Sequence, residues 1–447
     1  MKTMKKQLNT ALITLFVCSL NACTFFKTEA VVDPNFASVS SVIDNASKGQ
    51  LNDLAVGQIA TARDGLAIYL RVTGTIGKEL FNFNTTESRW MTELNGLRTI
   101  DNSAFYNGAT TTFGLPVRQA NILIASASKT TDPTVTDQNK NGYRGLANTF
   151  KGLAYLYMLN VQGSNGVRLN VEDPYKPSKL ASYAESLAGI AKILDEGATQ
   201  LDAAGTSFAF PLPGTYAGFN TPVTFKRFNR AIALRVAIYQ ADWAKAATIL
   251  PTTFYNAAGD LNVGPRHAFN ATPPDNPNPL LNTSTERIVA VQKLFDDIEK
   301  GDTRISKVRV LDPAAEYTSG TKYATKYITN MYADANGPVP IIRNEELILI
   351  AAEIAAQQGN TAEATRNINV VRAGAGLGAY VGATTKDALI NAILKERIYS
   401  LFYEGHRWVD MRRYNKLAEI ALPVAGMKVL DRLEKPVAEV NWDIANP

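Results

Sequence analysis

A helix, a two-residue polar turn and a second helix rich in alanine form the feature that most constrains the fold of this chain. The first helix is expected over residues 343–358, where apolar residues recur at helical spacing. They are Leu347, Ile350, Ala351 and Ile354. Gly359-Asn360 makes the turn, and the second helix is expected over residues 361–372. Small residues on both helices let them pack closely, so this region predicts a helix hairpin.

Helix pairs of the same design are expected near 42–71 with 117–128, at 143–204, at 226–250 and at 343–404. Such a pair is the unit of a tetratricopeptide-like repeat, in which neighbouring units bury each other's apolar faces. We therefore expect a mainly α fold, with tetratricopeptide-like helix pairs forming a right-handed superhelical body and few short strands. Long irregular loop insertions are expected at about 73–113, 206–223 and 251–340. Long loops in a compact helical body usually carry function.

The first residues have the pattern of a bacterial lipoprotein signal. Lys2, Lys5 and Lys6 precede an apolar stretch over residues 8–20, which ends in Leu20-Asn21-Ala22-Cys23. We expect residues 1–22 to be the signal peptide and Cys23 to carry lipid such as palmitate. Residues 23–40 then form a tether and 41–447 a single domain. An ordinary secretory signal with an incidental cysteine is the alternative.

Cysteine content and charge limit the classes of function. The only cysteines are Cys18 and Cys23, so the mature domain would contain no thiol and no disulfide. Loss of three lysines with the signal lowers the formal net charge from +5 to +2, and no basic run remains. The sequence therefore lacks the basic patch that nucleic-acid binding requires. A lipid anchor on this body predicts a protein that lies on a membrane without spanning it.

The densest group of charged and aromatic residues, residues 404–413, is expected to be structural rather than catalytic. On one helix over 387–404, Glu396 and Glu404 would lie about 12 Å apart. Paired glycosidase carboxylates require roughly 5–9.5 Å. The neighbouring Arg397 and Arg407 favour ionised structural pairs. Gly405 suits the left-handed position that ends a helix. We therefore expect no catalytic residue and no enzymatic activity.

Metal and cofactor sites have no sequence signature. The two histidines, His267 and His406, are far apart in the sequence, and no His/Cys cluster has ligand spacing. The glycine-rich run over 374–378 follows an expected helix and lacks the Lys-Ser/Thr of a phosphate loop, which predicts a helix end and turn. We expect no metal and no cofactor.

A ligand with both apolar C–H faces and hydroxyls needs an aromatic ring flanked by polar side chains. The best candidate is Trp90, which lies in the 73–113 insertion near Arg89, Asn84 and Asn95. A buried anchor for the insertion is the alternative interpretation of Trp90. A second candidate wall consists of Tyr317, Tyr323 and Tyr327. Trp243 and Trp408 are expected to be packed.

Several motifs together resemble the SusD/RagB family of outer-membrane nutrient-binding lipoproteins. They are the segment before Cys23, the helix pairs, the Arg343-Asn344-Glu345-Glu346-Leu347 run and the closing Glu404-Gly405-His406-Arg407-Trp408-Val409-Asp410 motif. The resemblance follows nearly the whole chain in order. It departs from the family after Cys23, where residues 24–29 carry scattered charge rather than an acidic run.

The resemblance implies a surface-exposed protein, anchored in the outer membrane, that serves nutrient uptake. It would bind a glycan or oligosaccharide and take part in carbohydrate transport by delivering it to a SusC-like TonB-dependent transporter. The loops that contact ligand are the least shared part of the family, so the resemblance does not identify the substrate. Binding of peptides or another non-glycan oligomer is the first alternative, and a helical-repeat membrane scaffold without a small ligand is the second.

Overall fold

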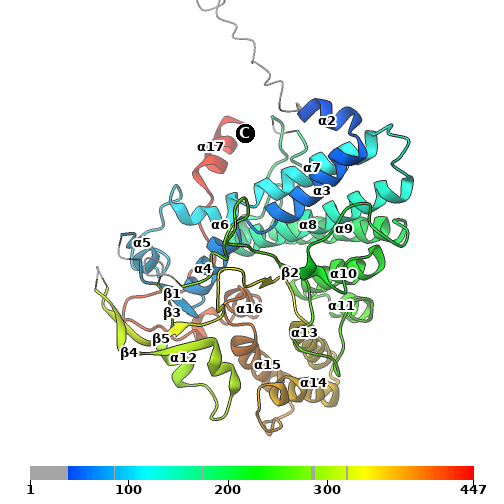
Figure 1. Ribbon diagram of the computed structural model, residues 1–447. Coiled ribbons are helices and arrows are strands. Elements are labelled where there is room, and N and C mark those ends of the chain that lie inside the picture. Colours follow the sequence, from blue (N-terminus) through cyan, green and yellow to red (C-terminus); the bar gives the residue numbers. More distant parts are fainter. Residues whose placement is uncertain (1–38, 85, 174, 283–286, 319–320, 447) are drawn as a thin grey trace, which may run out of the picture.

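The computed structural model describes residues 39–446, except 85, 174, 283–286 and 319–320. The expected signal peptide, the lipidated Cys23 and most of the tether lie outside the described residues. Within them, helices dominate and strands are few (Figure 1), as expected for the fold class. No helix in the described part has the length and apolar character needed to cross a bilayer.

Antiparallel helix pairs build the first part of the body. Their bounds are α2 Val39–Asn45, α3 Lys48–Thr61, α4 Leu66–Ile76, α7 Gly114–Lys129, α8 Asp137–Gln162, α9 Tyr183–Asp202, α10 Pro222–Tyr239 and α11 Trp243–Ile249. Helices α7 to α11 pack one against the next (Figure 1). Capping boxes begin three of them: Thr136 starts α8, Ser182 starts α9 and Thr221 starts α10. The expected pairs are therefore confirmed.

The C-terminal helices follow the predicted order with one different boundary. They are α13 Asn344–Gln357, α14 Thr361–Gly374, α15 Lys386–Ser400 and α16 Arg407–Arg413. The helix expected over 387–404 was predicted too long, because α15 ends at Ser400. Tyr403 and Gly405 then take positive φ angles of 62° and 81°, which turn the chain into α16. The expected left-handed position of Gly405 is confirmed.

A four-stranded antiparallel sheet was not expected at this size. Its strands are β1 Leu80–Asn82, β3 Ile288–Ala290, β5 Tyr323–Thr329 and β4 Val308–Tyr317, in the order β1-β3-β5-β4. A second pair joins β2 Arg266–His267 to β6 Val339–Pro340. The β4–β5 register shifts between Val310 and Ala315, beside Pro313, which cannot donate a ladder hydrogen bond. This interruption hides the alternation that would have predicted β4.

Short elements complete the chain. They are α5 Arg89–Thr92, α6 Gly108–Thr111, α12 Gln292–Asp296, α17 Val437–Ala445, η1 Phe105–Asn107, η2 Gly163–Asn165, η3 Gly214–Tyr216, η4 Leu250–Thr252, η5 Thr303–Lys307 and η6 Leu417–Glu419. The insertion over 73–113, expected to be an irregular loop, buries most of its aromatic residues. Phe81, Trp90 and Tyr106 are each at most 5% exposed, because the sheet and its neighbouring helices enclose them.

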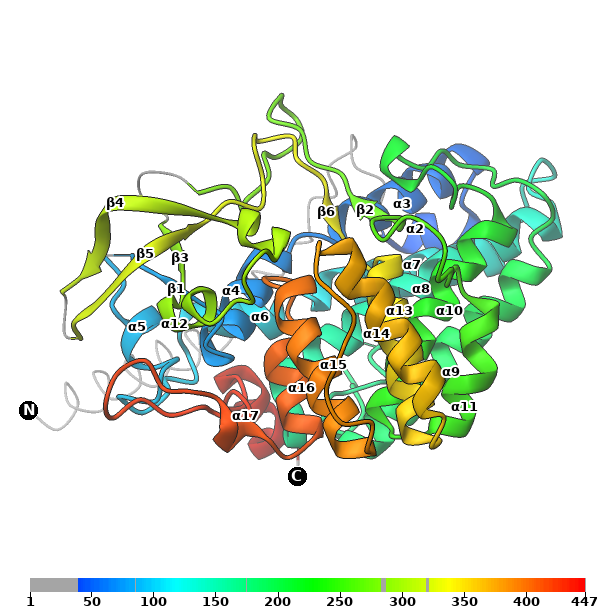
Figure 2. The same ribbon diagram turned by 90° about the horizontal axis from the view of Figure 1, so that it is seen from below.

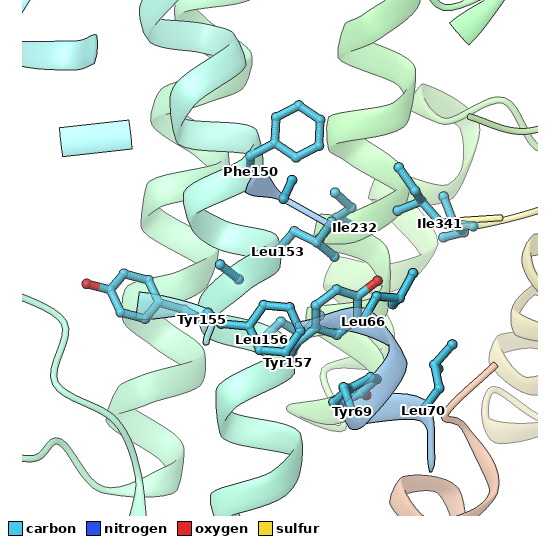
Figure 3. Close-up of a cluster of buried hydrophobic side chains, with 14 of the residues drawn as sticks. Leu66, Tyr69, Leu70, Phe150, Leu153, Tyr155, Leu156, Tyr157, Ile232 and Ile341 are labelled. Atoms are coloured by element: carbon cyan, nitrogen blue, oxygen red, sulfur yellow. The ribbon is translucent and has the colours of Figure 1, made fainter. Parts of the chain in front are cut away.

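The main core lies where α4, α8 and α10 meet. Figure 3 shows Leu66, Tyr69 and Leu70 of α4 facing the apolar side chains of α8, with Ile232 of α10 beside them. Ile341, which precedes α13, closes the same cluster. This core joins the N-terminal helix pairs to the C-terminal region and holds the connecting loops in fixed positions.

Candidate ligand-binding cleft

A polar cleft of about 440 Å³ opens beside the N-terminus of α13. Its walls come from η5, from the loop over 331–338, from the loop over 261–266 and from the end of α14. Figure 2 shows the loops around β2 and β6 rising between the sheet and helices α13 and α14. Four segments that are distant in the sequence therefore form one concave surface.

Arg343 forms the floor of the cleft. Its guanidinium donates to Glu404 Oε1 at 2.6 Å and to the Ser400 carbonyl at 2.7 Å, and it also pairs with Glu345. The residue is only 5% exposed. A buried arginine with carboxylates on two sides keeps one orientation, because any other would leave buried charges unpaired. The floor is thus rigid and already neutralised.

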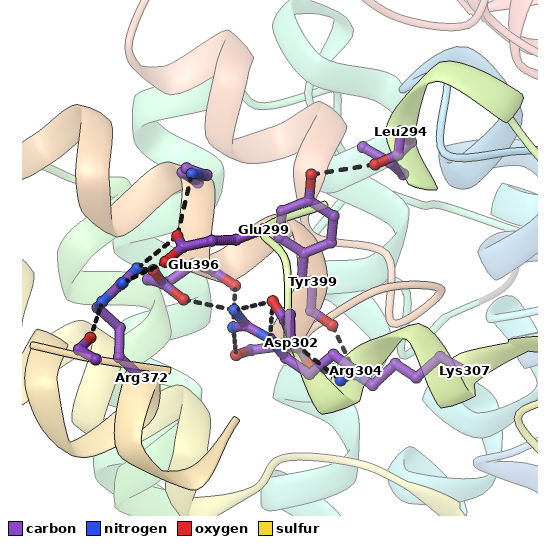
Figure 4. A network of polar contacts seen from close by, with 11 residues as sticks. Leu294, Glu299, Asp302, Arg304, Lys307, Arg372, Glu396 and Tyr399 are labelled. Atoms are coloured by element: carbon purple, nitrogen blue, oxygen red, sulfur yellow. Dashed lines mark hydrogen bonds and ion pairs between the residues drawn. The ribbon is translucent and has the colours of Figure 1, made fainter. Parts of the chain in front are cut away.

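A second ionic network supports the cleft from behind (Figure 4). Glu396 lies between two arginines, 2.7 Å from Arg304 and 2.9 Å from Arg372. Lys307 donates to the carbonyls of Tyr399 and Ser400 at 2.8 and 2.5 Å. Burial is the main cause that lowers the pKa of Lys307 to about 8, and the positive charge of the nearby Arg343 adds to it. These contacts tie η5 to α14 and α15 and fix the wall that faces the opening.

The rim carries one aromatic ring among hydrogen-bonding groups. Tyr332 is half-buried and packs its ring against the core. Arg266 donates to the Asn262 carbonyl at 2.9 Å, and Asp334 accepts from the Asn336 backbone at 2.8 Å. An aromatic face flanked by amide, carboxylate and guanidinium groups can bind a ligand that has both apolar C–H faces and hydroxyls.

The carboxylates of the cleft are poorly suited to acid catalysis. Burial alone would raise the pKa of Glu345, but Arg343 and Lys307 hold it below its usual range. A glycosidase acid needs a carboxyl whose pKa is raised. Glu404 has its oxygens on Arg343. The geometry favours binding over bond cleavage.

The first set of residues expected to bind ligand lies away from this cleft. Trp90 is 5% exposed and packs on Phe105, with ring centroids 4.8 Å apart. Asn95 is fully buried and accepts from Lys78 at 2.7 Å. Trp90 therefore lies where a buried anchor for the insertion would lie, which was the alternative interpretation.

Two members of that set remain partly accessible. Arg89 is 34% exposed at its side chain and pairs with Glu87 at 2.5 Å. Asn84 accepts from the backbone N–H groups of Thr86 and Glu87 at 2.9 and 3.0 Å, which shapes the turn after β1. The structure keeps Asn84 and Arg89 in one neighbourhood. Their binding role stays a prediction.

The three tyrosines of the second expected wall do not form a single exposed surface. Tyr317 and Tyr327 are 2% and 6% exposed. Tyr323 packs edge-on against Phe81, with centroids 5.1 Å apart, and its hydroxyl accepts from the Gln292 backbone at 2.8 Å. Tyr317 and Tyr323 lie in one apolar cluster with Phe81 of β1 and with Phe83, which follows it. Their role in ligand binding stays a prediction.

The closing motif over 404–413 lies in a buried ionic network. Arg397 donates to Asp410 at 2.6 Å, and Trp408 is fully buried. Ionised structural pairs were expected, but with different partners. Glu396 pairs with Arg304 and Arg372 rather than Arg397, and Glu404 pairs with Arg343 rather than Arg407. Glu396 and Arg397 are adjacent on α15 and so point in different directions. Glu404 lies beyond the end of α15, where the chain has left the helix.

The two histidines are buried separately and both remain neutral near pH 7. Burial, and then Arg63, lowers the pKa of His267 to about 3. Burial is also the main cause that lowers the pKa of His406 to about 4. Among the described residues, no group of three or more His, Cys, Asp and Glu side chains could hold a metal ion.

The candidate cleft residues that the sequence did not indicate are Arg266, Lys307 and Tyr332. They come from the two-residue strand β2, the short 3-10 helix η5 and a loop, so no periodic pattern marks them. The only useful signal was the length of the 251–340 insertion, which indicated function without naming a residue.

A sequence model described as the SusD family matches residues 295–446. This region contains most of the cleft wall and the whole closing motif. Over this region the chain resembles SusD-family proteins. A curated relative, SusD-like protein P38 from Formosa agariphila, is 31% identical over 125 residues, which are 26% of this chain and 24% of that protein. The match thus spans about a quarter of the curated relative.

Solved structures share the fold of this chain. Surface glycan-binding protein A from Bacteroides thetaiotaomicron, in complex with laminarihexaose, has a TM-score of 0.67 at 14% identity and covers 89% of this chain and 98% of its own. A SusD superfamily protein from Bacteroides vulgatus has a TM-score of 0.63 at 15% identity, with 88% and 97% covered. A laminarin binding SusD-like protein has a TM-score of 0.61 at 18% identity, with 86% and 96% covered.

Proposed function

We propose that this chain is a non-enzymatic nutrient-binding lipoprotein of the outer membrane that captures a glycan at the cell surface. The observation that carries the proposal is the polar cleft, where Tyr332 stands among the polar groups of Asn262, Arg266 and Asp334. The resemblance to SusD-family proteins supports the class of function. The glycan ligands of the similar structures support the class of ligand.

The chemistry of the cleft suits a neutral oligosaccharide. Tyr332 would stack against the apolar face of one sugar ring, and the rim would exchange hydrogen bonds with its hydroxyls. The floor charges are already paired at Arg343, so a neutral ligand leaves no buried charge without a partner.

The proposed anchor and partner follow from the resemblance. Lipid on Cys23 would hold the body at the membrane through the tether over 23–40, and residues 41–447 would form the single binding domain. The captured glycan would pass to a SusC-like TonB-dependent transporter. Co-purification of this chain with such a transporter encoded beside it would support the partnership, and separate elution in mild detergent would oppose it.

Calorimetric titration tests the binding proposal, with laminarihexaose and maltohexaose as probes. Tyr332→Ala should weaken binding of whichever of these two oligosaccharides the natural chain binds. The affinity should fall about tenfold or more, equivalent to about 1.4 kcal/mol of binding free energy. Tyr175→Ala is the matched control, because Tyr175 is 84% exposed and lines neither this cleft nor its rim. Equal affinity of both variants would place the ligand elsewhere.

The surface near Asn84 and Arg89 is a second proposed contact region. Arg89→Ala tests it better than truncation of Trp90, because removing a buried tryptophan costs about 3–5 kcal/mol of stability. If Arg89→Ala loses glycan affinity while Tyr332→Ala keeps the affinity of the natural chain, the binding site lies at that surface and not in the cleft.

Two alternatives give different results in the same assays. Titration with a mixed oligopeptide pool tests peptide capture. Saturable heat with the peptides but not with the oligosaccharides would indicate a peptide ligand. A scaffold without small ligand would bind neither. Release of reducing ends from either oligosaccharide would contradict the non-enzymatic proposal.

A further inference from the structure

A second cavity, distant from the polar cleft, lies beneath the C-terminal helix α17. It encloses about 380 Å³ between the start of α7, the end of α8, the loop over 166–180 and α17. This volume falls within the range of small-molecule pockets in proteins. The proposed glycan function does not use this space.

The cavity wall is mainly apolar. Val117 and Val167 are buried beside it, and Met158, Leu180 and Trp442 complete its sides. Figure 3 shows Tyr155 pointing away from the main core cluster, on the other side of α8 from Leu153 and Ile232. Its hydroxyl donates to the Leu169 carbonyl at 2.8 Å, so the ring rather than the hydroxyl is available to a ligand.

Apart from Arg118, which is exposed, the polar groups at the wall have partners. Gln162 donates to Thr110 at 2.9 Å and accepts from Asn165 at 3.0 Å. Arg168 donates to the Ser178 carbonyl at 2.7 Å and pairs with two carboxylates of α17. A charged ligand inside the cavity would therefore lose its hydration without gaining a buried partner, whereas an apolar one would not. The wall selects an uncharged, chiefly apolar molecule.

Helix α17 covers the cavity but is weakly anchored. None of its residues is buried. Its side-chain attachments run through Arg168, which lies 2.6 Å from Glu439 and also pairs with Asp443. The Val437 backbone N–H donates to the Asn102 carbonyl at 2.9 Å. An element with few buried contacts opens locally at low cost, so α17 can admit a ligand without unfolding the body.

We propose that this cavity is a second ligand site, which takes an uncharged, chiefly apolar small molecule under α17. Trp442 and Tyr155 supply its aromatic walls, and the pairing of Arg168 with Glu439 and Asp443 holds it closed. The site is independent of glycan capture, so failure of either proposal leaves the other standing.

Titration of the full chain with N-phenyl-1-naphthylamine tests the site. This probe is uncharged and fluoresces strongly in apolar surroundings. Gly114→Phe should weaken saturable probe binding at least tenfold, because Gly114 lines the cavity and the added ring would take up its space. An added Cβ at Gly114 meets no atom within 4 Å, so the backbone should tolerate the substitution. Gly214→Phe is the matched control, since its Cβ is equally unobstructed and it lies outside the cavity.

Energy transfer from tryptophan to the probe locates the bound molecule. Excitation of tryptophan should give probe emission in the natural chain, and Trp442→Phe should remove most of it while directly excited emission remains. Absence of saturable binding in the natural chain would overturn the proposal. Equal affinities of Gly114→Phe and Gly214→Phe, or transfer unchanged in Trp442→Phe, would overturn it as well.

Discussion

At the scale of single residues, buried charge pairs fix the geometry of the C-terminal region. Arg235 of α10 donates to both oxygens of Glu346 on α13, at 2.8 and 2.6 Å. Their side chains are 3% and 0% exposed, and Arg235 holds the pKa of Glu346 at about 2 against the effect of burial. Such a pair orients two helices, because a shift of either helix would leave charge unpaired in the interior.

Replacing Arg235 should therefore destabilise the fold strongly. Arg235→Met leaves Glu346 buried without its main partner, which costs about 3–5 kcal/mol. Arg366→Met is the control, since its pair with Glu363 is exposed and such pairs are worth about 0–1 kcal/mol. Urea unfolding followed by circular dichroism measures both. Similar midpoints for the two variants would contradict the structural role.

His267 should make the stability depend on pH. Burial lowers its pKa to about 3, while the unfolded chain protonates it near 6.5. Between these values the unfolded state binds one more proton, so the free energy of unfolding falls as pH falls from 6.5 toward 3. The expected slope is about 1.4 kcal/mol per pH unit from this group.

His267→Phe removes that proton-binding group. The difference in unfolding free energy between the natural chain and the variant should be constant above pH 6.5 and should shift in favour of the variant below it. Urea unfolding at pH 7.5, 6.0 and 5.0 measures this difference. A difference that stays the same at all three values would show that His267 is protonated equally in both states.

At the scale of elements, the helices follow local pattern and the strands do not. The helix pair over 343–372 was predicted to within a few residues, because helical periodicity and the Gly359-Asn360 turn are local signals. The β4–β5 hairpin was missed because its register breaks and its partners β1 and β3 are distant in the sequence. Candidate residues on this sheet were then expected to be exposed, although sheet packing buries them.

The turn between α15 and α16 should depend on Gly405. Its φ is 81°, and an added Cβ would lie 2.8 Å from the ring of the buried Tyr69. Gly405→Ala should cost about 2 kcal/mol or more, because strain and overlap add. Gly378→Ala is the control, since its Cβ meets nothing within 4 Å. A thermal melt separates the two variants, and equal melting temperatures would contradict the proposed strain.

At the scale of the whole molecule, two of the concave surfaces on the helical body have opposite character. The cleft near Arg343 is polar and rigidly supported by ion pairs, whereas the cavity under α17 is apolar and loosely covered. These differences favour a hydroxyl-rich ligand in the first and an apolar one in the second. The N-terminal segment would place both beside a membrane.

Anchoring should require Cys23 and no other thiol. Cys23→Ala should move the protein from the membrane fraction to the soluble fraction and abolish labelling by a radioactive fatty acid. Cys18→Ala should leave both unchanged, because Cys18 lies within the expected signal peptide. Continued fatty-acid labelling of Cys23→Ala would show that the lipid is attached elsewhere.

The sequence alone determined the helix pairs, the left-handed turn at Gly405 and the SusD-type resemblance, because each depends on residues close together in the chain. Tertiary structure decided which charges pair, that Trp90 is buried, and that Tyr332, Arg266 and Lys307 share one cleft. Glu396, for example, meets Arg304 and Arg372 rather than the adjacent Arg397. Ion-pair partners and sheet neighbours come from distant segments, and only packing of the whole chain brings them together.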